Sequence, residues 1–229
     1  MGVPVSVILF LFSCLFPLYL QAGAFFRFEE GGFNGRIART QSGTTIPFNS
    51  SNGTISSVEG AFGDRYRFLI GGSYASYEGV VSTATGDTTK KLEYGDIRSG
   101  LVYTSDSCCE WHLLVMRAQI PYTEAPSINT LVPRTASISY LRFEAILRAK
   151  AKNFQIETTY YLNHGLDQPA LESGGNIKNN YNFGGCERVL FGNNFLWGPS
   201  ICVELQELYL PYDTTITRQE VHGRFVIEF

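Results

Sequence analysis

Hydrophobic and polar residues alternate over several long stretches of the chain. The clearest stretch is 136–151, where Leu141, Phe143 and Leu147 share one parity and charged residues share the other, with Ile146 as the apolar exception. The charged positions are Arg142, Glu144, Arg148 and Lys150. A side-chain period of two is typical of a β-strand with one apolar and one polar face. This stretch therefore predicts a long strand.

The same alternation recurs along the chain. It is found at 65–78, 92–104, 154–163 and 221–229, and weaker patterns lie between these stretches. We predict strands at 33–39, 54–61, 65–78, 92–104, 110–120, 137–149, 154–163, 183–197, 201–210 and 219–229. The apolar parity slips between Leu205 and Leu208, which suggests a bulge or a curled strand end. Ten strands are preferred, with eight or twelve as alternatives.

The connections between these strands alternate in length. The long ones fall at 40–53, 79–91, 121–136, 164–182 and 211–218, and the short ones at 62–64, 105–109, 150–153 and 198–200. A transmembrane β-barrel sorts its loops in this way, with long loops outside and short turns inside, whereas a soluble β-sandwich has no reason to do so. The strands are also long, since membrane strands need roughly 9 to 11 residues and soluble strands average about five or six.

The N-terminus has the pattern of an export signal. Val5 to Leu20 is almost continuously apolar and precedes Gln21-Ala22-Gly23-Ala24, a small-residue site of the kind that signal peptidase cleaves. We predict a secretory signal peptide at 1–24 and one domain at 25–229. A single membrane anchor, or a lipoprotein signal that would leave Cys14 lipidated, are the alternatives.

Composition narrows the class further. The chain has 17 Phe, 13 Tyr and 23 Gly, a mixture that favours strands and turns. With 17% charged residues and a net charge of -3, its bulk charge gives no reason to expect nucleic-acid binding. No apolar run after residue 24 approaches the roughly 20 residues that a membrane helix requires. If the domain lies in a membrane, it therefore crosses as strands.

The C-terminus carries a more specific feature, the sequence Arg224-Phe225-Val226-Ile227-Glu228-Phe229. With the predicted signal and the alternation, this ending resembles the small β-barrels of the bacterial outer membrane. The resemblance implies a single antiparallel transmembrane barrel in the outer membrane, surrounded by lipid and assembled by the barrel-assembly machinery. It further implies that Phe225, Ile227 and Phe229 are the assembly signal. We expect a monomer, and no internal motif identifies a subfamily or a ligand.

The polar faces of the predicted strands would line the lumen. The candidate lumen charges are Arg65, Arg67, Asp96, Arg98, Arg142, Glu144, Arg148, Glu157, Arg224 and Glu228. Because both signs are present, we expect the charges to pair across a narrow barrel and fill it. A constricted pore with an arginine-rich wall is the alternative. The function expected is structural, pore-like or surface attachment.

Catalytic and metal-binding patterns are weak. His112, His164 and His222 lie far apart and form no metal-ligand spacing, so we expect neither a metal nor a cofactor. His164 and Asp167 are the one candidate acid–base pair in a long loop, and no nucleophile motif stands beside them. We therefore do not expect an enzyme.

Four cysteines follow the predicted signal, at Cys108, Cys109, Cys186 and Cys202. In an oxidising compartment they allow three disulfide connectivities. Cys186 and Cys202 would face each other if the turn centred on Asn193-Asn194, but the preferred turn at 198–200 would place them out of register. Two glycosylation triplets, at 49–51 and 52–54, support the rival interpretation, a secreted β-sandwich that binds carbohydrate or protein.

Overall fold

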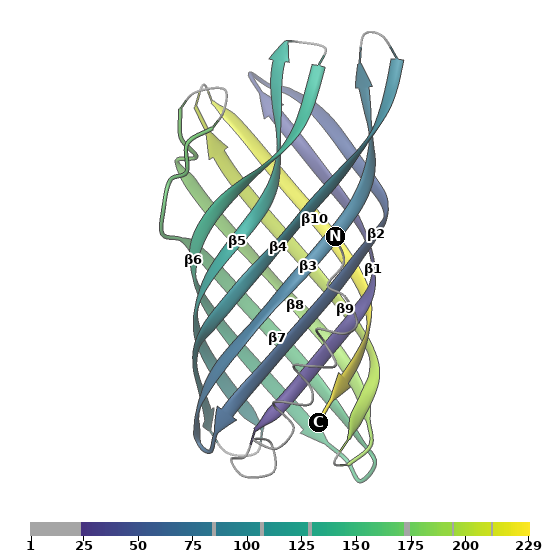
Figure 1. Cartoon of the computed structure of the whole chain (residues 1–229), viewed down its shortest axis with the longest axis vertical. Helices are drawn as coiled ribbons and strands as arrows, with labels where there is room; N and C mark the ends of the chain where they lie inside the picture. The colour runs from purple at the N-terminus through teal and green to yellow at the C-terminus, as the bar shows by residue number, and fades with distance from the viewer. Residues whose placement is uncertain are drawn as a thin grey trace, which may run out of the picture.

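The computed structural model is a single closed β-barrel (Figure 1) and describes residues 24–83, 86–105, 108–127, 130–171, 175–193, 195–211 and 213–229. Its strands are β1 (Phe25–Gln41), β2 (Thr44–Gly63), β3 (Tyr66–Thr83), β4 (Gly86–Ser105), β5 (Cys109–Ser127), β6 (Thr130–Lys150), β7 (Phe154–Gly165), β8 (Asn179–Phe191), β9 (Leu196–Leu210) and β10 (Thr214–Glu228). The predicted signal peptide lies outside the described residues, apart from Ala24. Among the described residues, no helix is long and apolar enough to cross a membrane.

Every strand pairs antiparallel with its neighbours in sequence, and β1 closes the barrel against β10. The closing ladder runs without interruption from the pair Arg27 and Glu228 to the pair Gln41 and Thr214. The start of β1 and the end of β10 lie at the same end of the barrel (Figure 1). The predicted ten-stranded antiparallel barrel is therefore confirmed.

One end of the barrel is wrapped by apolar side chains that face outward. On β6, Phe143 is 49% exposed and Leu147 is 45% exposed, while Glu144 between them is buried. The same holds for Phe68 and Ile70 on β3 and for many residues on the other strands. The surface of a soluble protein does not carry a continuous apolar band of this kind. The band is therefore the surface that contacts the acyl chains of the lipid.

Towards the opposite end the pattern inverts, because apolar side chains there point into the barrel. On β5, the outward Leu113 and Val115 give way to the inward Met116 and Ile120 within one strand. On β6, the inward Ile138 and its neighbours precede the outward residues of the band. Beyond the membrane the outer surface meets water, so the apolar face must turn to the interior to be buried.

This inversion explains the parity slip that the sequence shows on β9. Val203 lies on the outer surface, whereas Leu208 is buried inside the barrel. The pairing of β9 with β10 continues through this point without a shift in register. The predicted bulge between Leu205 and Leu208 is therefore wrong. The surroundings change from lipid to water while the strand stays regular.

Most of the predicted long loops are strand. β1 and β2 are joined by a tight turn at Ser42 and Gly43, so the loop predicted at 40–53 does not form. The stretches at 79–91, 121–136 and 211–218 likewise belong mostly to strands. Their backbones pair in the ladders of β3 with β4, β5 with β6, and β9 with β10. One connection, 166–178 between β7 and β8, is long.

The turn predicted at 198–200 is also wrong. β8 ends at Phe191, and β9 begins at Leu196. Gly192 has a φ of 115°, a backbone conformation that favours glycine, and it begins the turn. Pro199 instead lies within β9, opposite Phe225 of β10. The turn at 192–195 brings Cys186 opposite Cys202.

Candidate functional site

The interior of the membrane-spanning part holds a network of ion pairs centred on Glu157, which is fully buried. Its Oε2 atom accepts hydrogen bonds from Arg27 Nη2 at 2.8 Å and from Arg148 Nε at 2.9 Å. Its Oε1 atom accepts one from Arg188 Nη1 at 2.9 Å. One carboxylate thus joins arginines from β1, β6 and β8.

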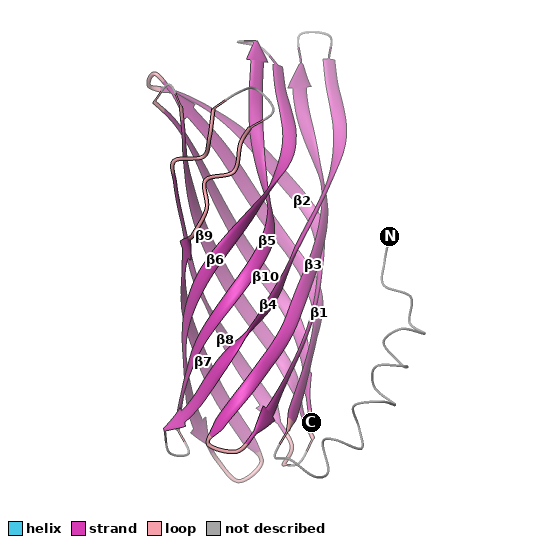
Figure 2. Ribbon diagram, turned by 60° about the vertical axis from the view of Figure 1, so that its left-hand side comes forward, coloured by secondary structure: helices cyan, strands magenta, loops and turns pink. Residues whose placement is uncertain are grey.

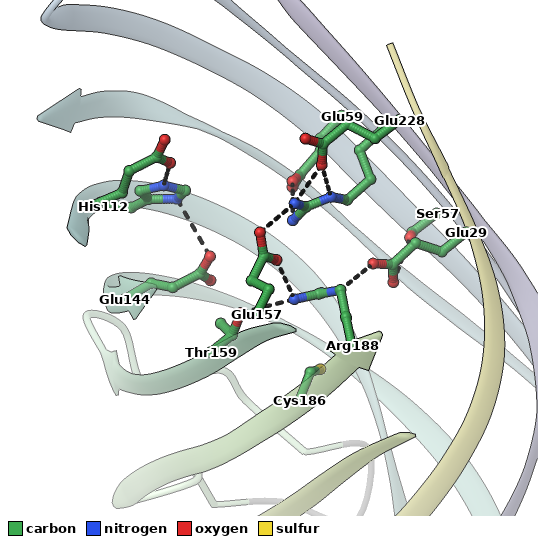
Figure 3. A network of polar contacts seen from close by, with 12 residues as sticks. Glu29, Ser57, Glu59, His112, Glu144, Glu157, Thr159, Cys186, Arg188 and Glu228 are labelled. Atoms are coloured by element: carbon green, nitrogen blue, oxygen red, sulfur yellow. Dashed lines mark hydrogen bonds and ion pairs between the residues drawn. The ribbon is translucent and has the colours of Figure 1, made fainter. Parts of the chain in front are cut away.

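The network continues across the lumen through Arg188 (Figure 3). Arg188 Nε donates to Glu29 Oε1 at 2.9 Å, and Arg224 Nη1 donates to Glu29 Oε2 at 2.7 Å. Arg27 also donates to Glu228 and lies 3.4 Å from Glu59. Because positive and negative groups alternate, each buried charge is neutralised by hydrogen-bonded partners.

His112 belongs to the same network. It is 1% exposed, with Nε2 3.3 Å from Glu110 and Nδ1 3.3 Å from Glu144. Glu110 also pairs with Arg67 and Arg148. This histidine lies between two carboxylates and is closed off from solvent.

A second group of charges lies at the boundary with the apolar upper interior. Tyr94 Oη lies 2.8 Å from both carboxylate oxygens of Glu220 and donates to them, and Arg218 pairs with Glu204 and lies over the Tyr94 ring. Tyr161 Oη donates to Glu204 at 2.8 Å. Arginine, tyrosine and carboxylate groups therefore interlock where the two kinds of interior meet.

A cavity of about 100 Å³ remains between the network and the apolar upper interior. Charged residues such as Arg142 and Arg224 line one side, and apolar residues such as Met116 and Ile120 line the other. A water molecule occupies about 30 Å³ in the liquid, so this space has room for a few waters.

Apolar clusters close the interior at both ends. Towards the termini, one cluster consists of Phe25, Ala61, Leu69, Val102 and Leu114, and another of Leu190, Leu196 and Val226. At the other end a larger cluster includes Tyr77, Tyr122 and Ile138. The loop between β7 and β8 adds Leu171 and Ile177 to this cluster. Apolar clusters therefore lie on both sides of the charged network and its cavity.

The structure places nine of the ten candidate lumen charges on the inward face of their strands, among the residues of this network. Arg98, for example, pairs with Asp96 at 2.9 Å and with Glu59 at 3.2 Å. Arg65 does not lie in the lumen. It is exposed at the turn between β2 and β3 and donates to Tyr103 Oη at 2.8 Å, because the barrel wall has already ended there.

Several network residues were not among the sequence candidates. They are Arg27, Glu29, Glu59, Glu110, Arg188, Glu204, Arg218 and Glu220. Arg27 and Glu29 were missed because β1 was predicted to begin at residue 33. Arg188 lies in the predicted strand 183–197, next to the apolar Val189. The alternation of these two residues indicates that Arg188 points into the barrel.

The cysteines form two different pairs. Cys186 and Cys202 are joined by a disulfide that links β8 to β9 on the inward face. The sulfur atoms of Cys108 and Cys109 lie 3.1 Å apart without a bond between them. The sequence left three connectivities open, and the register of β8 with β9 decides among them.

The candidate acid–base pair is not brought together. The His164 ring lies against Tyr181, whereas Asp167 accepts hydrogen bonds from the Ser139 backbone at 3.0 Å and from Arg117 Nη1 at 2.7 Å. Partial burial raises the pKa of Asp167, but the hydrogen bonds from Ser139 and Arg117 outweigh burial and lower it. Asp167 thus anchors the loop to β5 and β6. Among the described residues, no group of His, Cys, Asp and Glu side chains could hold a metal ion.

The predicted C-terminal signal residues lie on the outer surface of β10 and just after it. Phe225 is 49% exposed and Phe229 is half-buried against Phe195. The Phe229 backbone exchanges two hydrogen bonds with Phe26 at the start of β1. The C-terminal strand therefore completes the closing seam of the barrel.

A closed antiparallel barrel with an apolar outer band and a charged interior defines an integral β-barrel protein of the bacterial outer membrane. No protein-family model and no curated protein matches the sequence. Solved structures do match. OmpT, an outer membrane protease from Escherichia coli, superposes with a TM-score of 0.57 at 8% identity, over 90% of this chain and 96% of that one.

Two further similar structures are membrane barrels with other roles. The translocator domain of the autotransporter NalP from Neisseria meningitidis gives a TM-score of 0.44 at 11% identity, over 98% of this chain and 96% of that one. An outer membrane channel from Pseudomonas putida F1 gives 0.49 at 10% identity, over 90% and 95%. At such identities, the likeness describes the fold.

Proposed function

We propose that this protein is a non-conducting outer-membrane barrel that serves in surface attachment through the strands that project beyond the membrane. The observation that carries the proposal is the length of β2 to β6, which have 18 to 21 residues each. A membrane crossing needs roughly 9 to 11 residues. The additional residues of these strands therefore extend beyond the bilayer.

The projection lies at the end opposite the termini, which faces the cell exterior in this class. Among the β3 residues whose side chains are described, the last exposed large apolar one is Ile70, and the strand continues to Thr83. On β5 the corresponding residue is Val115, and the strand continues to Ser127. The hairpins β3–β4 and β5–β6 stand above the rest of the barrel (Figure 2). The buried Tyr77 of β3 and Tyr122 of β5 belong to the apolar cluster on which these hairpins stand.

A narrow pore is the competing function. It requires a water-filled path, whereas the described interior is occupied by the Glu157 network and by apolar clusters on both sides. Opening a path would break several buried ion pairs together, and each such break is strongly unfavourable. The filled interior favours the non-conducting barrel.

A protease role like that of OmpT is less well supported than attachment. Such a role needs an acid–base group that substrate can reach. His112 and His222 are 1% and 2% exposed, and His164 lies on the outer surface beside Tyr181. These histidine positions favour attachment over catalysis.

Conductance separates the first two roles. Purified protein is inserted into planar lipid bilayers, with heat-modifiability on a detergent gel as the control for folding. We expect folded protein with no stepwise current. Reproducible single-channel steps from folded protein would replace the attachment role with the pore.

Attachment is tested by shortening the projection. In one variant, residues 80–89 at the tip of the β3–β4 hairpin are replaced by a two-residue turn, and in a second variant the β5–β6 tip at 124–131 is shortened in the same way. Cells producing each barrel are compared for settling in suspension and for retention on glass coated with serum proteins. Attachment should fall at least several-fold in one or both variants while outer-membrane levels stay equal. Unchanged attachment in both variants, or none in the parent, would contradict the proposal.

A further inference from the structure

Two cysteines adjacent in sequence lie where β5 begins, at the end of the barrel that carries both termini. Cys108 is exposed, Cys109 is half-buried, and their sulfur atoms are 3.1 Å apart. This end faces the periplasm in outer-membrane barrels, and the bacterial periplasm is an oxidising compartment. A close pair of thiols is therefore presented to a compartment in which disulfides are exchanged.

The other cysteine pair is unsuited to exchange. Cys186 and Cys202 are 8% and 2% exposed, already bonded to each other, and turned into the barrel. An attacking thiolate must reach a disulfide sulfur directly. The barrel thus holds one protected structural disulfide and one accessible dithiol.

We propose that Cys108 and Cys109 form a thiol–disulfide exchange site that takes an accessible periplasmic disulfide as its substrate. The Cys108 thiolate attacks one sulfur of that disulfide, forms a mixed disulfide and displaces the first thiolate. Cys109 gives up its proton and attacks the Cys108 sulfur, which displaces the second thiolate and joins the two cysteines. The dithiol is oxidised and the substrate disulfide is reduced to two thiols, so that electrons and protons balance.

The order of the two steps follows from exposure. Cys108 is the accessible sulfur, so it makes the first attack, because exchange rates depend on access as well as on the thiolate fraction. Cys109 is held beside it by its place in the ladder, opposite Ser105 and Leu147. A resolving thiol at 3.1 Å has a very high effective concentration relative to any thiol in solution.

The site is joined to the interior network through the backbone. The Arg148 amide donates to the Cys108 carbonyl at 2.7 Å, and Glu110 follows Cys109 directly. Arg148 and Glu110 pair with each other inside the barrel. The exchange site therefore adjoins two residues of the interior network through the backbone.

The test uses the full-length barrel in detergent, treated with a mild reductant that leaves the buried disulfide intact and then freed of reductant. The probe is 5,5′-dithiobis(2-nitrobenzoate), whose released thiolate absorbs visible light. The parent should release two thiolates per barrel and retain no adduct, with peptide mass mapping showing a link between Cys108 and Cys109. Cys109→Ser should release one thiolate and retain one adduct on Cys108.

Three outcomes would overturn the proposal. They are adducts on both cysteines of the parent, a retained single adduct on the parent, and no reaction by folded parent. The matched control is Cys108→Ser, in which the half-buried Cys109 should react at least several-fold more slowly than Cys108 does in Cys109→Ser. A faster reaction of Cys109 would overturn the assignment of the attacking sulfur.

A second arm distinguishes small from macromolecular substrates. Cys109→Ser is incubated separately with oxidised glutathione and with oxidised thioredoxin, and mixed disulfides are measured by mass. A glutathione adduct indicates a small-molecule disulfide, and a thioredoxin adduct indicates a protein disulfide. Formation of neither adduct would overturn the proposal for both substrate classes.

Discussion

At the scale of single residues, the interior is governed by the need to neutralise every buried charge. Glu157 accepts hydrogen bonds from three arginines and is fully buried. Charges removed from water carry a penalty of several kcal/mol each, which is offset by close partners. The network therefore adds little net stability, and its main effect is to fix which side chains pair with one another in the lumen.

Glu157→Gln should destabilise the barrel by about 3–5 kcal/mol, because it leaves three buried guanidinium groups without their shared carboxylate. The measurement is denaturant unfolding in detergent, followed by the fluorescence of Trp111 and Trp197. The matched control is Glu93→Gln, which removes the exposed pair with Lys91 and should change stability little, because water screens an exposed pair. Equal changes in the free energy of unfolding would show that the buried Glu157 ion pairs contribute no more than an exposed pair.

At the scale of strands, the barrel depends on close approach at its closing seam. Gly31 of β1 lies opposite Arg224 of β10, and a Cβ atom at Gly31 would lie 2.0 Å from the Gly223 carbonyl oxygen and 2.6 Å from Arg224 Cα. Backbone atoms cannot move aside as a flexible side chain can. The seam can close at this point because residue 31 has no side chain.

Gly31→Ala should therefore weaken the seam by at least about 1–3 kcal/mol, the usual cost of overpacking. The folded fraction is measured from the mobility of unboiled protein in the outer-membrane fraction. Gly223→Ala is a matched control on the same seam, because a Cβ atom there would meet nothing within 4 Å. Similar folding of the two variants would contradict the requirement for close approach.

At the scale of the whole molecule, one barrel passes through two environments. In the membrane its apolar side chains face outward and its charges face inward, whereas beyond the membrane its apolar side chains face inward. The interior consequently changes from an ion-pair network to an apolar core along the axis. This arrangement lets the wall continue outside the bilayer without exposing an apolar surface to water.

The position of the apolar band predicts a contrast within one strand face. Phe143→Arg puts a charge into the band and should cost about 2–4 kcal/mol if it lies near the bilayer midplane. Ser137→Arg lies on the same face of β6 but above the band, so it should change folding into lipid vesicles little. Vesicle folding yields and denaturant midpoints are measured for both variants. An equal loss of stability in the two variants would contradict the membrane boundary placed between residues 137 and 143.

Much of the fold could be predicted because strand periodicity is a local property. The outward Leu141 and Phe143 and the inward Arg142 and Glu144 follow from their order alone, since successive side chains of a strand point to opposite faces. The same reasoning placed Arg224 and Glu228 inside the barrel. The class of protein and the strand number rest on this information.

The prediction of strand ends and turns failed because the face on which apolar side chains lie changes with position along the barrel axis. The many polar residues at 79–91 and 121–136 suggested loops, yet their backbones belong mostly to the strands of two long hairpins. The shift from Leu205 to Leu208 suggested a bulge for the same reason. A single parity rule cannot describe a strand whose outer solvent changes from lipid to water.

The sequence by itself determined that this is an all-β chain whose alternating faces suit a membrane barrel, because alternation arises from backbone geometry between neighbouring residues. The tertiary structure alone decided where the strands end, that Cys186 bonds Cys202, and that Glu157 gathers Arg27, Arg148 and Arg188. These outcomes depend on the register of the ladders and on closure of β1 against β10. Both bring together residues whose separation along the chain carries no local signal.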